Sequence, residues 1–335
     1  MTDNPARLAA RALAPAAALL LAASLAPPAR AATLTVGPTT QQYRTVTAAV
    51  AAARDGDTVQ VQAGTYTNDF PTVSRKITIA GVNGMARLIA TVAPPNGKGI
   101  IVTNTDVTLS HLELAGAKVS DGNGAGVRYQ GGALTLSKCY VHNNQDGVLA
   151  NAVPSGTVTI LDSEFAYNGA GDGYTHGVYV NQVASLDVER SYFHDTKVGH
   201  HIKSRATRSV IRLNRLIDGA NGTASYDIDL PDGGNALVGS NVIEQGAATQ
   251  NPTIIHYGGE GGPYAGSRLL VTSNAINNDK AGTAVGVLNQ TSLIVAVQYN
   301  RTYHLPTLVT GPNTQASNTI LASPYPVNTS HPWAQ

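Results

Sequence analysis

A short unit recurs along most of the chain. It reads apolar-x-x-Asn/Ser-x-apolar, and its clearest copies begin at Ile160, Val188, Ile211, Val238 and Val271. Successive copies lie about 23 to 33 residues apart, which is the period of a solenoid rather than of a domain. One copy cannot bury its apolar face alone, so neighbouring copies must stack, with strands about 4.8 Å apart. The repeat therefore predicts an all-β solenoid with one continuous core.

The polar position of the unit has a structural interpretation. It holds Ser163 and Ser191 and then asparagine in later copies, while Cys139 occupies it in an earlier copy. A turn into the core leaves backbone groups unpaired, and stacked asparagine side chains can pair with them while tolerating left-handed backbone angles. We therefore expect this column, the cysteine included, to be buried and structural rather than catalytic.

Composition narrows the alternatives. Leucine-rich horseshoes and propellers are competing repeat folds, but neither the leucine motif nor the Trp-Asp motif occurs, and the single tryptophan is Trp333. Charged residues make up 13% of the chain, with 22 basic and 21 acidic residues. This balance lacks the basic patch that nucleic acid or an anionic membrane requires, so we expect neither as a partner.

The ends of the chain differ from the repeat. Residues 1–31 combine Arg7 and Arg11, an apolar run over 12–26 and the small-x-small sequence at 29–31. This pattern predicts a signal peptide. An uncleaved anchor is the alternative, but the apolar run is shorter than the roughly 20 residues of a spanning helix, which favours cleavage and export. The mature protein is then secreted or periplasmic, without a membrane span, and we expect a monomer. The solenoid is predicted over 32–302, and an irregular tail over 303–335.

The N-terminal part resembles a known family. A helix is predicted over 45–55 from the spacing of Val46, Ala49, Val50 and Ala53. It is followed by GDTVQVQAGTYT and then KITIAGV, at 76–82. This order resembles the entry of right-handed parallel β-helix proteins of the pectin-lyase-like superfamily. The resemblance implies that the helix covers the open end of the core, and that an extended polysaccharide is the partner.

A second strand in each coil can be aligned on an inward apolar residue. Because strand side chains alternate, the following residue of each copy faces outward. The predicted outward column is Arg128, Leu149, Tyr179, Lys203, Asp229 and His256.

Ionisable side chains gather around this column in a chain otherwise poor in charge. We predict a site here because several acid–base types converge on one face. The alternative is a ladder of ion pairs, Lys203 with Asp229 and His201 with Asp227, worth about 0.2–1 kcal/mol each. The candidate catalytic residues are Lys203, His201, Asp227, Asp229, Tyr179 and His256. The candidate substrate-binding residues are His176, Arg205, Tyr226, Arg128 and Tyr257.

Elimination from an acidic polysaccharide needs a base, a group that stabilises the developing charge, and an acid for the leaving oxygen. Lys203 and His201 are the candidate bases, and Tyr179 and His256 are the candidate acids. Arg205 is placed to neutralise the sugar carboxylate. Since Asp229 raises the pKa of a neighbouring lysine, Lys203 is better suited to stabilise charge, with a histidine as base.

The segment HHIKSRATRSVIRLNRLIDG is similar to the lysine-serine segment of the chondroitinase B and alginate lyase family. The resemblance implies that Lys203 is the base. The chain departs from that family at Asp227, where the family has its catalytic arginine. It departs again at Val198 and His200, which replace acidic calcium ligands.

Two other functions remain open. THGVYV at 175–180 and HIK at 201–203 are similar to motifs of polygalacturonases, whose paired aspartates have only Asp146 and Asp172 as counterparts. That resemblance implies an inverting hydrolase. The missing arginine and calcium ligands favour a non-catalytic protein that binds surface or matrix polysaccharide. We therefore predict a polysaccharide lyase or epimerase, with these two alternatives.

The run Asp227-x-Asp229-x-x-Asp232 also suggests calcium. It lacks the bidentate glutamate of an EF-hand loop, and no further oxygen ligands follow in the sequence. We predict no metal and no cofactor, with calcium as the alternative.

Overall fold

The computed structural model describes Met1 and residues 31–219 and 221–334. The predicted signal peptide, except for its first and last residues, lies outside the described residues. Within the described part, no helix is long and apolar enough to cross a membrane.

The first element covers the end of the core. Strand β1 (Thr33–Val36) pairs with the first coil, and helix α1 (Val46–Ala52) packs against β1, β2 and β3. The Thr45 hydroxyl accepts a hydrogen bond from the Ala48 amide at 3.2 Å and caps the helix. Val46, Ala49 and Val50 are buried, as the apolar spacing predicted. The helix is shorter than 45–55, because the backbone is already extended at Ala53.

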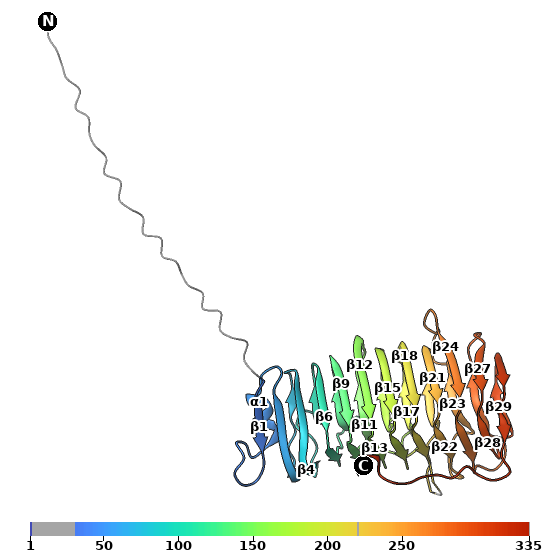
Figure 1. Cartoon of the computed structure of the whole chain (residues 1–335), viewed down its shortest axis with the longest axis horizontal. Coiled ribbons are helices and arrows are strands. Elements are labelled where there is room, and N and C mark those ends of the chain that lie inside the picture. Colours follow the sequence, from blue (N-terminus) through green and yellow to red (C-terminus); the bar gives the residue numbers. More distant parts are fainter. Residues whose placement is uncertain (2–30, 220, 335) are drawn as a thin grey trace. The chain divides into compact units, whose positions relative to one another are not determined.

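Each following coil contributes strands to two parallel sheets, which enclose the core between them (Figure 1). The described strands of the smaller sheet are β3 (Thr72–Val73), β5 (Gly99–Thr103), β8 (Ala125–Tyr129), β11 (Asp146–Ala150), β14 (Val178–Val180), β17 (Ile202–Ser204), β20 (Ile228–Leu230), β23 (Thr253–Tyr257), β26 (Val285–Asn289) and β29 (Thr307–Thr310).

The larger sheet receives two strands from most coils. Besides β1, its described strands are β2 (Thr58–Thr67), β4 (Ile77–Ile89), β6 (Val107–Ser110), β7 (Leu112–Ala115), β9 (Ala133–Ser137), β10 (Tyr140–His142), β12 (Val153–Leu161), β13 (Glu164–Ala166), β15 (Val183–Glu189), β16 (Tyr192–His194), β18 (Arg208–Arg212), β19 (Arg215–Ile217), β21 (Asn235–Gly239), β22 (Val242–Gln245), β24 (Arg268–Thr272), β25 (Ala275–Asn278), β27 (Val295–Gln298), β28 (Arg301–Tyr303), β30 (Asn313–Ala316) and β31 (Thr319–Ile320).

The Asn/Ser column forms the corner between the paired strands of the larger sheet. Asn214 is typical: its Oδ1 accepts from the Ser191 amide at 2.9 Å, and its Nδ2 donates to the Val188 carbonyl at 2.9 Å. The same bonds recur from coil to coil, so the column is buried and structural, as predicted. The left-handed backbone, however, belongs to the residue before each column member, for example Leu213 at φ 60° and Ser240 at φ 56°. The asparagines thus pair with the corner without adopting its strained angle.

The predicted boundary at residue 302 is wrong, because the coils continue. β29, β30 and β31 pair in parallel register with β26, β27 and β28. The apolar pattern fails there because these strands are rich in threonine and are partly or largely exposed.

The last residues run back along the larger sheet, towards the label β13 in Figure 1. Asn277 holds the Tyr325 backbone at both its amide and its carbonyl, at 2.9 and 2.8 Å. Further along, the buried Glu164 carboxylate accepts from Trp333 Nε1 at 2.7 Å and contacts His331 Nδ1 at 2.7 Å. The tail therefore lies along the side of the coils, covering part of one sheet.

Candidate functional site

The predicted outward column is present on the smaller sheet. The strand register joins Arg128 to Leu149, Leu149 to Tyr179, and so on through Lys203 and Asp229 to His256. The residues before them, such as Ile202 and Ile228, are fully buried in the core. Parallel strands in register bring these side chains to one face, because equivalent positions of successive coils stack directly.

Lys203 lies at the centre of the ionisable side chains that gather on this outward face, which we call the cluster. Its Nζ is 3.0 Å from Asp229 Oδ2 and 2.9 Å from Glu260 Oε1, and it lies 5.9 Å from the centre of the Tyr179 ring. Burial alone lowers the pKa of Lys203, but the Asp229 and Glu260 carboxylates outweigh it and raise this pKa. The ammonium therefore stays protonated at neutral pH. Lys203 can stabilise negative charge, and it is poorly suited to remove a proton.

Asp229 is fully buried and lies between three nitrogen groups. Besides Lys203, its carboxylate is 2.7 Å from His256 Nδ1 and 3.5 Å from His200 Nε2. Burial alone raises the pKa of Asp229, but the hydrogen bond from His256 and the nearby charges lower it to about 2. Asp229 is thus a fixed anion. In turn, although burial lowers the pKa of His256, the bond to Asp229 raises it overall.

Arg205 follows β17 and lies two residues from Lys203, on the same face. Its Nε donates to the Tyr179 hydroxyl oxygen at 3.1 Å, and its two Nη atoms contact the carboxylates of Asp232 and Glu260. The Tyr179 side chain is half-buried and the Arg205 side chain is 18% exposed. A cation and a phenol therefore meet at the surface of the cluster, where solvent reaches them.

Four rings stack along the solenoid beside these charges. His176, His200, Tyr226 and His256 follow one another with ring centres 4.7, 5.0 and 4.7 Å apart. The Nδ1 atoms of His176 and His200 each accept a backbone amide hydrogen bond, at 3.0 Å. Burial lowers the pKa of His176 well below its usual value and that of His200 to about 4. Both rings are therefore neutral, with the remaining proton on Nε2.

His201 and Asp227 do not reach the surface, so the prediction that they face a substrate is wrong. His201 is fully buried, and its Nε2 lies 3.3 Å from Asp218 Oδ1 and 3.6 Å from Asp227 Oδ1. Burial, followed by the Asp218 carboxylate, raises the pKa of Asp227 well above its usual value. The physical reason is local: β17 begins at Ile202, so His201 belongs to the turn that precedes this strand rather than to the alternating strand.

Two predicted binding residues also lie outside the cluster. Tyr257 is fully buried and donates its hydroxyl to the Gly234 carbonyl at 2.7 Å, because alternation from the outward His256 turns it into the core. Arg128 donates to Asn151 at 2.7 Å and is separated from Tyr179 by the Leu149 coil. By contrast, His176, Tyr226 and Arg205 lie within the cluster.

The residues considered for calcium and for hydrolysis do not form those sites. Asp227 faces His201, Asp229 faces Lys203 and Asp232 faces Arg205, so the three carboxylates do not converge. Within the described ranges, no group of three or more acidic, histidine or cysteine side chains is arranged to hold a metal ion. Asp146 is almost completely buried, and burial raises its pKa to about 8, whereas Asp172 is exposed.

Three further side chains at or beside the cluster were not predicted from the sequence: Glu260, Asp218 and Gln290. Glu260 contacts both Lys203 and Arg205, and the side-chain oxygen of Gln290 lies 2.7 Å from His256 Nε2. Glu260 and Gln290 lie in loops without the repeat, so no alignment of coils places them. The only signal for Glu260 is that it is the single charged residue of the glycine-rich segment GGEGGPYAG at 258–266.

The comparisons with known proteins agree with the coil geometry. A family model described as a right-handed β-helix region matches residues 83–216. This match agrees with the parallel β-helix that the structure shows over the described residues. No curated protein matches its sequence.

Several solved structures share this β-helix fold at low sequence identity. An alginate lyase from Paenibacillus sp. str. FPU-7 is 16% identical with a TM-score of 0.58, over 84% of this chain and 99% of that one. Pectate lyase Pel9A is 15% identical with a TM-score of 0.52, over 89% of this chain and 79% of that one. The PL6 family alginate lyase AlyGC is 15% identical with a TM-score of 0.50, over 87% of this chain and 40% of that one. At this identity the likeness shows the fold.

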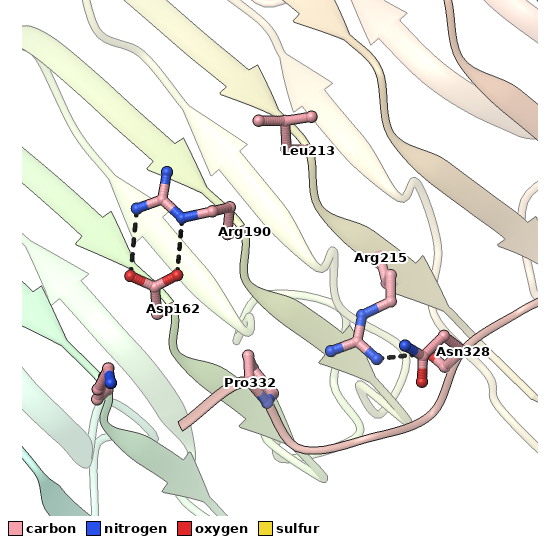
Figure 2. Close-up of a pocket in the computed structure, with 7 residues that line it drawn as sticks. Asp162, Arg190, Leu213, Arg215, Asn328 and Pro332 are labelled. Carbon is pink, nitrogen blue, oxygen red and sulfur yellow. Dashed lines mark hydrogen bonds and ion pairs between the residues drawn. The ribbon is translucent and has the colours of Figure 1, made fainter. Parts of the chain in front are cut away.

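A pocket elsewhere on the β-helix has a different character. It lies where the returning tail meets the larger sheet, and Figure 2 shows Arg190, Arg215, Asn328 and Pro332 around it. Arg190 pairs with Asp162 at 2.7 Å, and Arg215 donates to the Asn328 and Ser330 carbonyls. Arg190 thus pairs within the surface of the coils, whereas Arg215 holds the tail. The pocket is a consequence of that packing and contains none of the acid–base cluster.

Proposed function

We propose that this β-helix protein is exported and acts on an acidic polysaccharide, as a lyase or as an epimerase that shares the proton-abstraction step. The observation that carries the proposal is the pair of cations on one strand face, Lys203 and Arg205, beside the Tyr179 hydroxyl. Two cations in a protein of low charge, on a surface that extends over several coils, suit a polymer with a carboxylate on each sugar. Solved lyases with the same fold, which act on pectate and alginate by their names, support this substrate class.

In the proposed elimination, the C–H bond beside the sugar carboxylate breaks and its electrons form a double bond, while the C–O bond to the next sugar breaks. Lys203 and Arg205 neutralise the carboxylate and stabilise the charge that develops on it. We assign the proton transfer to Tyr179, which enters the reaction as the phenolate, takes the proton from carbon to become the phenol, and then delivers that proton to the leaving oxygen. Arg205 Nε, by donating to the Tyr179 oxygen, stabilises the anionic form of the hydroxyl in both steps. In an epimerase the C–O bond stays intact, and a donor on the opposite face adds a proton to the same carbon.

Incubation with a panel of polyuronates tests the proposal. Ultraviolet absorbance follows the unsaturated end that elimination creates, and proton NMR detects epimerised sugars. We expect Tyr179→Phe and Lys203→Ala to lower kcat about 100-fold or more, in the range of lost proton transfer or charge stabilisation. Arg208→Ala is the matched control, because Arg208 is an exposed cation that pairs with Asp187 on the other sheet. Full activity of both site variants, or no change in any polyuronate, contradicts the proposal.

A binding protein without catalysis is the second candidate. One observation favours it, because both cations of the cluster already have a carboxylate partner. Lys203 pairs with Asp229, and Arg205 pairs with Asp232. Such a surface can hold an acidic chain without changing it. Retention of a polyuronate, weakened by Lys203→Ala, with unchanged chain length and no epimerised sugar, would select this function over the first.

A further inference from the structure

Glu260 differs from the other carboxylates of the cluster. Asp229 is fully buried against Lys203, and the Asp232 side chain is 13% exposed against Arg205. The Glu260 side chain is 45% exposed, yet it bridges both cations, with one oxygen 2.9 Å from Lys203 Nζ and the other in contact with Arg205 Nη2. Each cation thus has one fixed carboxylate of its own and shares a third one that faces solvent.

The segment that carries Glu260 is an exposed, glycine-rich loop. Gly258 and Gly259 have φ of 85° and 99°, and Gly266 has φ of 77°, values that glycine adopts at little cost. Residues 259–263 are all exposed, and a methyl group added at Gly262 would touch nothing.

The two ends of this loop are held firmly. The Gly258 amide donates to the Leu230 carbonyl at 2.9 Å, and the Tyr264 hydroxyl donates to the Arg205 carbonyl at 2.8 Å. The backbone bond of Glu260 itself, to the Pro231 carbonyl, is longer at 3.3 Å. The middle of the loop is therefore held less firmly than its two ends.

We propose that Glu260 occupies the position of a substrate carboxylate, and that an incoming uronate displaces it from Lys203 and Arg205. This inference rests on the proposed function. A uronate carboxylate offers the same two oxygens to the same two cations, whereas a neutral sugar offers no charge to replace the one removed. Glu260 thereby makes the site select acidic sugars, because only an anion restores the pairing that the glutamate gives up.

The size of the effect follows from competition. The apparent dissociation constant of a ligand equals its intrinsic value divided by the fraction of protein in which its position is free. If Glu260 fills the position in nine of ten molecules, its removal strengthens uronate binding about tenfold.

Methyl glycosides of single uronates test this directly. The methyl glycosides of galacturonate, glucuronate, mannuronate and guluronate have no sugar to eliminate, so NMR titration measures binding without turnover. We compare wild type, Glu260→Gln and Asp187→Asn, a control that removes the same charge from an exposed pair on the other sheet. The expected result is about three- to tenfold tighter binding of at least one uronate by Glu260→Gln alone, with no gain for its methyl ester.

Three outcomes overturn the inference. They are equal or weaker binding by Glu260→Gln, an equal gain for the ester, and no binding of any uronate even when Glu260 is removed. Each leaves the polymer assay free to support or contradict the proposed function separately, because that assay needs no change at Glu260. Faster amide exchange of peptides covering 258–267 in Glu260→Gln is the accompanying sign that the loop has been released.

Discussion

Replacing Asp229 with asparagine is expected to destabilise the protein and to change how its stability depends on pH. The carboxylate is fully buried, and Lys203 Nζ and His256 Nδ1 lie 3.0 and 2.7 Å from it. Its pKa falls from 3.8 to about 2 on folding. One pKa unit corresponds to about 1.4 kcal/mol, so ionised Asp229 contributes roughly 2 kcal/mol to stability.

The sign of the pH dependence follows from the lowered pKa. The contribution of Asp229 is complete above its unfolded pKa near 3.8, and it is lost as pH falls towards 2. At pH 7 the asparagine variant also leaves the Lys203 ammonium without its buried partner. Removing one member of a buried pair costs about 3–5 kcal/mol, which is the loss expected here.

Urea unfolding followed by circular dichroism at pH 7 and at pH 3 measures this loss. Asp187→Asn, in an exposed pair with Arg208, is the control and should cost no more than about 1 kcal/mol. The double variant Asp229→Asn with Lys203→Met should recover part of the loss, because no unpaired charge then remains. A single variant as stable as the control at pH 7, or a double variant less stable than the single one, would refute the reasoning.

Three further predictions concern the scaffold. Asn241→Ala removes hydrogen bonds to the Asn214 amide and the Ile211 carbonyl, at 2.9 Å each. The free energy of unfolding in urea should fall by about 2–4 kcal/mol. A loss below about 1 kcal/mol would show that the column is dispensable. Cys139 is buried and its pKa is raised to about 11 by burial, so it should not react with a thiol reagent until urea unfolds the protein, and rapid labelling of the native form would contradict this. Glu164→Gln weakens the contact with Trp333, so the fluorescence of this single tryptophan should shift to longer wavelength as the tail detaches; an unchanged spectrum would show that other contacts hold the tail.

The fold could be predicted from the sequence because the structural repeat of a solenoid appears as a repeat of residue types along the chain. Every coil needs an apolar residue at the same inward positions and a polar residue at the same corner, so Ile202 and Ile228, or Asn214 and Asn241, could be aligned without any structure. The same alignment placed Tyr179, Lys203 and Asp229 in one outward column, as the register confirms. Beyond residue 302 the coils become polar, so the apolar repeat can no longer be recognised in the sequence, although the parallel strand pairing continues.

The errors occurred where the repeat stops. His201 precedes the first residue of its strand, so alternation did not apply to it, and it is buried in the preceding turn beside Asp218. Glu260 lies in a glycine-rich loop that has no counterpart in other coils, and it reaches Lys203 across 57 positions of sequence.

By itself, then, the sequence determined the parallel coils, their structural column and the face on which acid–base side chains gather. Only the tertiary structure decided which of those side chains are exposed, which carry charge, and which carboxylate lies over the two cations. The physical reason is that a repeat specifies contacts between equivalent positions of neighbouring coils. Burial at corners and the reach of a loop depend on contacts between positions that are not equivalent, and these exist only once the chain is folded.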